Sequence, residues 1–234
     1  HFGVPQRTAQ PVDIVPQKRF TAGTLSGVRG RSAGQGQAKT IQGHAAVFYD
    51  PDAAGTEYEL FEGVTERIMG GAFDRALEEG DDARALFNHD PSLLLGRVSN
   101  GTVTLTKGQR GLHYSIKVDE NDPDHLRVLP KIERGDLSGS SFGFVIERAS
   151  WHEAERDDGT KAEYREVESV RLLDVSPVTF PAYGGTDVAL RAAGDPMGGV
   201  RESYEQWRQE KAKRRTGAGK WARLAFMPIP SRIG

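Results

Sequence analysis

Cysteine is absent from the 234 residues of this chain, which excludes a disulfide scaffold, a thiolate zinc site and a cysteine nucleophile. No apolar run comes near the roughly 18 residues that a membrane-spanning helix requires. The N-terminus lacks a basic segment followed by an apolar one, so we expect no signal peptide and no membrane partner. Aromatic residues make up only 8% of the chain, yet the apolar residues gather in strand-like runs, which predicts a globular protein.

Charge is divided unevenly along the chain. Residues 1–40 carry six Lys and Arg against one acidic residue, and residues 201–234 carry nine against three. Residues 41–200, by contrast, carry 16 Lys and Arg against 29 Asp and Glu. The pattern predicts an acidic folded body between two basic arms, which can bind acidic surfaces, bind nucleic acid or fold back on the body.

Composition places the boundaries of these parts. Residues 1–38 are rich in Gly, Pro, Gln and Arg, so we expect a basic, flexible N-terminal arm with one strand near residues 20–28. Residues 39–192 are expected to form one folded domain. Residues 193–234 are expected to be a basic C-terminal tail, with a charged helix over residues 204–214.

The hydrophobic pattern predicts a mainly β protein of the α+β class. Apolar and polar residues alternate along residues 112–118, and Asp122-Pro123-Asp124 is typical of a helix start. The expected strands are residues 40–48, 58–64, 84–87, 94–98, 102–106, 112–118, 141–147, 167–173 and 175–180, and the expected helices lie within residues 70–80 and 122–135. Many strands and two short helices favour a closed or nearly closed antiparallel barrel with the short helices packed outside.

Histidine is the commonest catalytic base at neutral pH, and the chain has six. We expect ordinary structural roles for five of them: His1, His44, His113, His125 and His152. His89 differs because it ends a short apolar strand and enters a turn, where a scaffold can present a side chain rigidly. Asp90 and Pro91 are expected to fix that turn. From position alone, a functional and a structural role for His89 are equally supported.

A serine-rich segment, residues 137–144, precedes an aromatic strand. A nucleophilic serine needs close access to a substrate carbonyl and nearby backbone N–H groups for the oxyanion. The small residues Gly139 and Ser140 would permit that approach. Taken alone, the segment is better explained as a polar loop with a Gly-rich helix C-cap.

Asp174 is an acid inside an otherwise apolar run, residues 171–182. Acids are seldom buried without a partner, and a histidine is a natural one because the acid fixes its tautomer. A strand-end acid that faces solvent is the structural alternative.

Four segments in order resemble the prohead proteases of HK97-type tailed phages. They are Gly-His-Ala-Ala-Val-Phe at 43–48, Asn-His-Asp-Pro at 88–91 with Leu-Gly-Arg at 95–97, Gly-Asp-Leu-Ser-Gly-Ser-Ser-Phe-Gly-Phe at 135–144, and Leu-Asp-Val-Ser-Pro-Val-Thr-Phe-Pro-Ala-Tyr at 173–183. The resemblance covers about residues 40–190. It implies a herpesvirus-assemblin-like barrel and serine protease chemistry in the domain at residues 39–192.

The resemblance also assigns roles to residues. It implies that Ser141 is the nucleophile, with Ser138 and Ser140 as close competitors, and that His89 is the general base. Asp174 becomes the orienting acid, and Glu168 and Glu166 are the alternatives. Arg97, Gly139 and Ser140 are expected to support the oxyanion.

The implied function is a serine endopeptidase that cleaves the major capsid protein precursor, its scaffolding region and itself during prohead maturation. We therefore expect it inside the assembling procapsid in the host cytoplasm, self-associating, with the C-terminal tail a candidate for removal by self-cleavage. We expect no cofactor, no metal and no requirement for nucleic acid. The first alternative is a catalytically silent structural or scaffolding component with the same fold. The second, a metal-dependent hydrolase using His89, Asp90, Asp124 and His125, lacks any tight ligand spacing.

Overall fold

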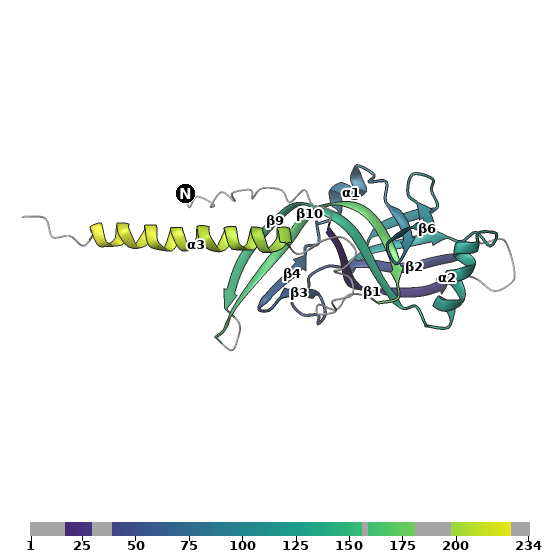
Figure 1. Cartoon of the computed structure of the whole chain (residues 1–234), viewed down its shortest axis with the longest axis horizontal. Helices are drawn as coiled ribbons and strands as arrows, with labels where there is room; N and C mark the ends of the chain where they lie inside the picture. Colours follow the sequence, from purple (N-terminus) through teal and green to yellow (C-terminus); the bar gives the residue numbers. More distant parts are fainter. Residues whose placement is uncertain (1–16, 30–38, 156–158, 181–197, 226–234) are drawn as a thin grey trace, which may run out of the picture. The chain divides into compact units, whose positions relative to one another are not determined.

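The structure is a computed structural model that describes residues 17–29, 39–155, 159–180 and 198–225. The chain divides into two compact units, His1–Gly194 and Asp195–Gly234. Among the described residues, all strands belong to the first unit, and the second unit contains one long helix (Figure 1). Within the same residues, no helix has the length and apolarity needed to cross a membrane.

The first unit is built mainly from strands, as the hydrophobic pattern predicts. The strands are β1 (Gln17–Arg29), β2 (Thr40–Val47), β3 (Glu57–Phe61), β4 (Val64–Ile68), β5 (Arg84–Phe87), β6 (Asp90–Arg97), β7 (Val103–Lys107), β8 (Gly111–Lys117), β9 (Gly139–Glu155) and β10 (Lys161–Val178). Two short helices interrupt them, α1 (Asp74–Glu78) and α2 (Pro123–Glu133). The α+β class is therefore confirmed.

The strands form one sheet in the order β3-β4-β10-β9-β1-β2-β8-β7, with β5 joined to β10 and β6 joined to β5. No ladder among the described residues joins the two ends of this order, so closure of the barrel stays a prediction. The expectation that all pairs are antiparallel is wrong, because β4 and β5 both run parallel to β10. β4 pairs with the first part of β10 and β5 with a later part, and α1 lies between β4 and β5 in the chain.

Strands β9 and β10 form a long antiparallel hairpin that curves along the whole sheet (Figure 1). They contain 17 and 18 residues, well above the usual five or six. This length lets one end of the hairpin carry β3 and β4 while the other end carries the segments that resemble a protease.

Strand β1 shows that residues before 39 contribute to the sheet. It lies between β9 and β2, and it contains the strand predicted near residues 20–28. A domain that began at residue 39 would lose this internal strand, so the N-terminal edge of the folded domain lies earlier than expected. Residues 1–16 and 30–38 of the predicted arm lie outside the described residues.

The core lies between the sheet and the two short helices. Phe142 stacks on Phe144 with ring centroids 4.6 Å apart, and Phe73, next to α1, meets Phe142 edge-on at 5.4 Å. All three side chains are fully buried, which stabilises each by about 1.5–3 kcal/mol relative to exposure. The end of β9 that precedes Phe142 is thus anchored in the core.

Helix α2 begins as the sequence predicts. Asp122 caps it by accepting a hydrogen bond from the Asp124 N–H at 2.8 Å, and Pro123 occupies the first turn. The buried side chains recur at helical spacing along one face: His125, Val128, Leu129 and Ile132. His125 Nε2 lies 2.7 Å from the Leu95 carbonyl oxygen, so the helix is tied to β6.

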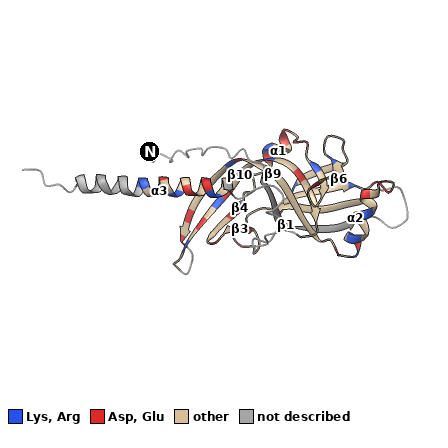
Figure 2. Cartoon of the chain, viewed as in Figure 1, with Lys and Arg blue, Asp and Glu red and all other residues tan. Residues whose placement is uncertain are grey.

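The second unit contains helix α3 (Gly198–Ala225), which confirms and extends the charged helix predicted over residues 204–214. Tyr204 and Trp207 stack along it with ring centroids 6.0 Å apart. Acidic and basic residues alternate along its described turns (Figure 2). The predicted boundary at 192–193 lies outside the described residues, as do the rest of residues 181–197 and residues 226–234.

Candidate active site

His89 is presented by a tight turn between two short strands. β5 ends at Phe87 and β6 begins at Asp90, and these residues pair, which leaves a two-residue loop. Asn88 and His89 have φ values of 53° and 57°, so both lie in the left-handed region that a type I′ hairpin requires. Asp90 and Pro91, expected to fix the turn, belong instead to β6.

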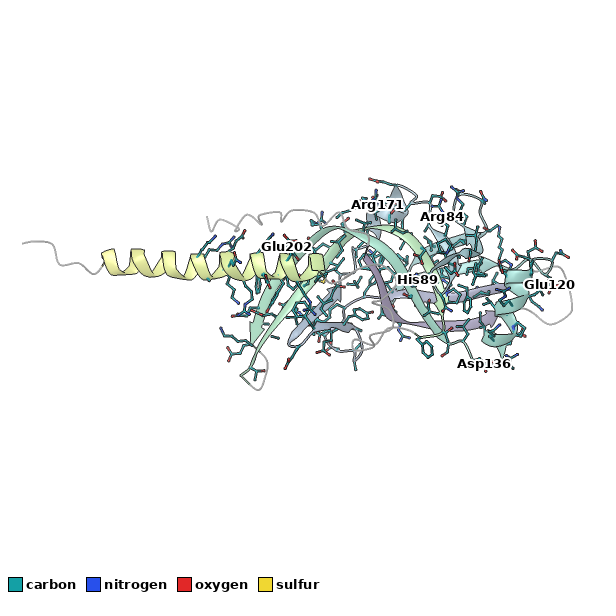
Figure 3. All side chains as sticks on the ribbon, in the orientation of Figure 1. Arg84, His89, Glu120, Asp136, Arg171 and Glu202 are labelled. Carbon is teal, nitrogen blue, oxygen red and sulfur yellow. The ribbon has the colours of Figure 1, made fainter. Side chains whose placement is uncertain are left out.

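The conformation of His89 is unfavourable in itself. A left-handed residue other than glycine costs about 1–2 kcal/mol, although asparagine and histidine adopt this region more often than most residues do. Strained backbone of this kind is concentrated at functional sites. Figure 3 shows His89 among the crowded side chains of the first unit, where it is only 4% exposed.

Asn88 fastens this turn to the end of β10. Its backbone N–H donates to the Pro177 carbonyl oxygen at 3.0 Å. Its side-chain Oδ1 accepts from the Thr179 N–H at 2.8 Å, and its Nδ2 donates to the Thr179 hydroxyl at 3.2 Å. Three hydrogen bonds therefore fix the His89 turn relative to the strand that carries Asp174.

Because side chains alternate along a strand, Ser140 and Ser141 lie on opposite faces of β9. Ser140 faces Tyr114, with the Ser140 hydroxyl 2.9 Å from the phenol oxygen. Burial raises the pKa of Tyr114 above its usual value. Ser141 points the other way, toward His89, and Ser138 precedes the strand and is exposed. Only Ser141 of the three predicted candidates has its hydroxyl against the His89 ring.

Asp174 reaches the same face through a bulge in β10. Leu172 pairs with Phe144, and Asp174 pairs with Gly143, so Leu173 is an extra residue in the ladder. Without that residue Asp174 would share the core face of Leu172. The carboxylate then occupies the space above Gly143, where an added Cβ would lie 2.1 Å from Asp174 Oδ2.

These placements bring His89 between Ser141 and Asp174. His89 Nε2 lies 2.8 Å from Ser141 Oγ, and His89 Nδ1 forms a short hydrogen bond with Asp174 Oδ1. With Asp174 as the acceptor at Nδ1, Nε2 is the ring nitrogen that can accept a hydrogen bond from the Ser141 hydroxyl. Ser141 is fully buried and Asp174 is 5% exposed. The low polarity around the three groups strengthens their interaction.

Ser176 is a fourth polar residue of this cluster that the sequence analysis missed. Its fully buried hydroxyl donates to Asp174 Oδ1 at 2.7 Å and lies 3.3 Å from His89 Nδ1. Ser176 also stands opposite Ser141 in the β9–β10 ladder. The available signal was its spacing, since residues two apart on a strand share a face and Ser176 follows Asp174 by two.

The alternative acids lie elsewhere on β10. Glu168 pairs with Arg148 at 2.8 Å and accepts a hydrogen bond from Ser150, and Glu166 lies 3.2 Å from His152. Glu166 pairs with Ser150 in the ladder, and Glu168 lies at the register shift between Val167 and Ser169, so both belong to the half of the hairpin away from Ser141. Of the three predicted acids, Asp174 is the one that contacts His89.

Arg97, expected to support the oxyanion, forms an ion pair with Asp82, and its part in the oxyanion site stays a prediction. Arg97 lies at the end of β6 opposite to His89, where its guanidinium binds Asp82 through Nε at 2.8 Å and through a second nitrogen. This bonding holds the pKa of Asp82 well below its usual range and raises the pKa of Arg97. Gly139 pairs with Val178 directly beside the Ser140–Pro177 pair, so the predicted oxyanion segment is close to Ser141 along β9.

The predicted metal-ligand set shows no shared site. His125 uses Nε2 toward Leu95 and Nδ1 as an acceptor from the Asp119 N–H at 2.8 Å. Over the part of the chain that the structure describes, no group of three or more His, Asp or Glu side chains is placed to hold a metal ion.

A serine, a histidine and an aspartate in this order of contacts form the arrangement found in serine proteases and related hydrolases. A family model described as caudovirus prohead serine protease matches residues 27–198. The chain therefore belongs to the caudovirus prohead serine protease family, as its four sequence segments indicated. Comparisons with curated proteins and with solved structures gave no match.

Proposed function

We propose that this chain is a serine endopeptidase that cleaves capsid and scaffolding protein during phage prohead maturation. The observation that carries the proposal is the position of His89, in contact with Ser141 through one ring nitrogen and with Asp174 through the other. Membership of the prohead protease family supports the same activity.

Ser141 is the proposed nucleophile and His89 the proposed base. Ser141 Oγ attacks a peptide carbonyl carbon while its proton passes to His89 Nε2. The carbonyl becomes an oxyanion that backbone N–H groups near Ser141, in the segment of Gly139 and Ser140, would stabilise. His89 then gives the proton to the leaving amine, the C–N bond breaks, and water releases the acyl group by the reverse proton path.

Asp174 is the proposed orienting acid. It holds the proton of His89 on Nδ1 and stabilises the imidazolium that forms when Nε2 takes the serine proton. Ser176 in turn donates to Asp174 Oδ1, which leaves the carboxylate less free to rotate. Two residues thus fix the side of His89 that faces away from the substrate.

Burial of the site has a consequence for how it works. Ser141 has no exposed surface and His89 is 4% exposed, so a peptide carbonyl can reach Oγ only after neighbouring atoms move apart. Active sites that exclude water in this way strengthen their electrostatic interactions. We infer that substrate entry requires an opening of the site.

The biological setting follows from the family. The proposed substrates are the major capsid protein precursor, its scaffolding region and the enzyme's own chain, and the proposed location is the interior of the procapsid. We propose that the basic ends, residues 1–38 and about 195–234, deliver the enzyme there and that the C-terminal part is a self-cleavage target. An assemblin-like closed barrel and self-association belong to the same proposal.

The rival function is a structural component that retains the fold without catalysis. Such a protein gains nothing from a buried chain of contacts that joins Ser141, His89 and Asp174, or from a left-handed histidine at the turn. Costly local features of this kind support a working active site.

The test is incubation of the purified chain with its cognate capsid protein precursor, followed by gel and mass analysis. We expect cleavage by the unsubstituted chain and by Ser138→Ala, the matched exposed-serine control, and none by Ser141→Ala. Cleavage that persists in folded Ser141→Ala and disappears in Ser138→Ala or Ser140→Ala would move the nucleophile. Absence of cleavage by every variant, with all of them folded, favours the structural rival.

A further inference from the structure

The orientation of Asp174 depends on the extra residue Leu173. Around Leu173 the pairing of β10 is irregular along both of its edges, the one that faces β9 and the one that faces β4 and β5. All register shifts of the β9–β10 ladder fall between Val167 and Asp174. The pairing of β4 with β10 ends at Val167, and the pairing of β5 begins at Asp174. Among the described strands, none pairs with the outer edge of β10 between these two points, so its backbone groups there need other partners.

The segment around α1 supplies those partners. The Val170 N–H donates to the Ala72 carbonyl oxygen at 3.0 Å, and the Arg75 guanidinium donates to the Val170 carbonyl oxygen at the same distance. The Leu172 N–H donates to Asp81 Oδ2 at 2.7 Å. A side-chain carboxylate thus replaces a strand partner one residue before the bulge.

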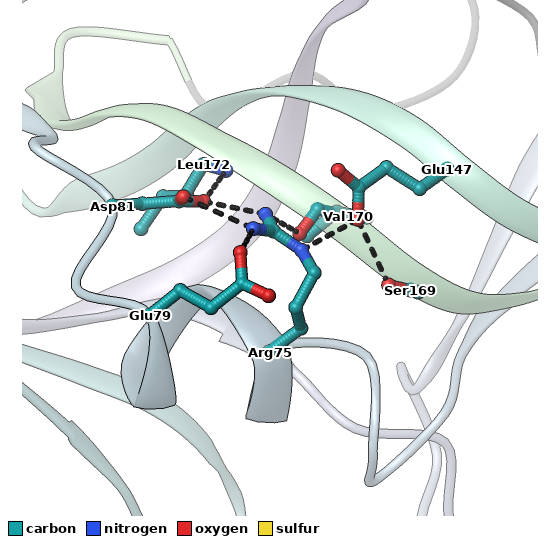
Figure 4. Close-up of polar contacts among 7 residues, drawn as sticks. All are labelled: Arg75, Glu79, Asp81, Glu147, Ser169, Val170 and Leu172. Carbon is teal, nitrogen blue, oxygen red and sulfur yellow. Dashed lines mark hydrogen bonds and ion pairs between the residues drawn. The ribbon is translucent and has the colours of Figure 1, made fainter.

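Asp81 is itself held in place by Arg75 (Figure 4). The two guanidinium NH2 groups reach the two carboxylate oxygens at 2.8 and 3.3 Å, a bidentate geometry that fixes the plane of the carboxylate. Arg75 also forms ion pairs with Glu79 and Glu147, each at 2.6 Å. Because Glu147 belongs to β9, the guanidinium links both strands of the hairpin to α1.

We propose that Asp81, oriented by Arg75, is a positioning residue for the active site. By accepting the Leu172 N–H it holds the Leu173 bulge, and the bulge turns Asp174 from the core face of β10 to the face that carries His89. Asp81 touches none of the reacting groups, so it acts through Asp174. This inference rests on the proposed function for its kinetic test and has a structural test that does not.

The structural test uses the hydrogen bond between His89 and Asp174. The proton on His89 Nδ1 should give a low-field proton NMR signal in the unsubstituted protein and in Glu79→Gln. Glu79→Gln is the matched control because it removes an exposed partner of Arg75 and leaves the bond to Leu172 intact. We expect the signal to be lost in Asp81→Ala and retained, weaker, in Asp81→Asn, whose amide oxygen can still accept. Absence of the signal from the unsubstituted protein, or its persistence in folded Asp81→Ala, contradicts the proposal.

The kinetic test uses a fluorophosphonate, which reports on Ser141 without a peptide substrate. Ser141 Oγ forms a bond to phosphorus, the P–F bond breaks, the serine proton passes to His89 Nε2, and fluoride leaves. We expect Asp81→Ala to slow this labelling about 10²-fold, the size of effect that a 1 Å misplacement can produce. Asp81→Asn should slow it less, and Glu79→Gln about twofold or less.

A double-mutant cycle decides whether Asp81 acts through Asp174. In the Asp174→Asn background, Asp81→Ala should slow labelling by about threefold or less, because the group that it positions is already impaired. Equal slowing in both backgrounds, with thermal denaturation showing folded protein, would assign Asp81 to general stability and overturn the proposal. If the unsubstituted protein is not labelled while the NMR signal behaves as expected, the proposed function fails and the positioning role stands.

Discussion

Replacing Gly143 by alanine places a methyl group against the carboxylate of Asp174. The added Cβ would lie 2.1 Å from Asp174 Oδ2, whereas ordinary contact begins at 3.4 Å. The carboxylate must therefore retreat by the difference, about 1.3 Å, or the two strands must separate. Either movement lengthens the hydrogen bond that joins Asp174 to His89.

The expected loss of activity is large, and the expected loss of stability is small. A displacement of about 1 Å at a positioning group can reduce the rate about 10²-fold. Overpacking costs about 1–3 kcal/mol, and replacing a glycine inside a strand returns about 0.5–1 kcal/mol, so the free energy of unfolding should fall by about 0–2.5 kcal/mol. Gly143→Ala should therefore fold and yet react slowly.

Fluorophosphonate labelling and chemical denaturation measure the two effects separately. The matched control is Gly70→Ala, because Gly70 is exposed and an added Cβ there meets nothing within 4 Å. In an Asp174→Ala background the clash is absent, so Gly143→Ala should no longer reduce stability. Near-normal labelling of folded Gly143→Ala would refute the claim that Asp174 needs the space above Gly143 to contact His89.

Three further predictions concern the residues around the turn. His89→Ala should be as inactive in peptide cleavage as Ser141→Ala, and the double variant no worse, because residues that act as a unit are not additive; multiplied losses would separate their roles. Asp174→Asn should reduce kcat less than either change, since the base can act weakly without its orienting acid; full activity would remove Asp174 from the site. Asn88→Gly keeps the left-handed turn but loses both side-chain hydrogen bonds to Thr179, so kcat should fall about tenfold with KM little changed. The control is Asn100→Gly in an exposed turn, and an equal fall in kcat there would show that the Asn88 bonds do not position His89.

Local signals in the sequence were enough for much of the fold. The cap formed by Asp122 and Pro123 predicts α2, and alternation predicts β8, because both depend on neighbours in the chain. The parallel pairing of β4 and β5 with β10 was not predictable in the same way. Strand direction in a sheet is decided by contacts between segments about 90–100 residues apart, which no local pattern records.

In the candidate site, too, some features depend on local sequence and others on contacts between distant residues. His89 and Ser141 could be proposed from their segments, and the structure brings them within 2.8 Å. The face on which Asp174 lies could not, because regular alternation would put it beside Leu172 in the core. Its position depends on a bulge whose backbone is bound by Asp81, a residue 91 positions away from Leu172. The position of Asp174 relative to His89 thus depends on a contact with a residue distant in the sequence, which the catalytic segments alone do not reveal.

The most direct measurement of the central claim is the site of fluorophosphonate attachment, mapped by tandem mass spectrometry. We predict a single adduct on Ser141, formed by the unsubstituted chain and by Ser138→Ala. The same adduct should be lost in His89→Ala, because no base then accepts the serine proton. An adduct on another serine, or undiminished labelling of Ser141 in folded His89→Ala, would contradict the assignment of His89 and Ser141 as one catalytic unit.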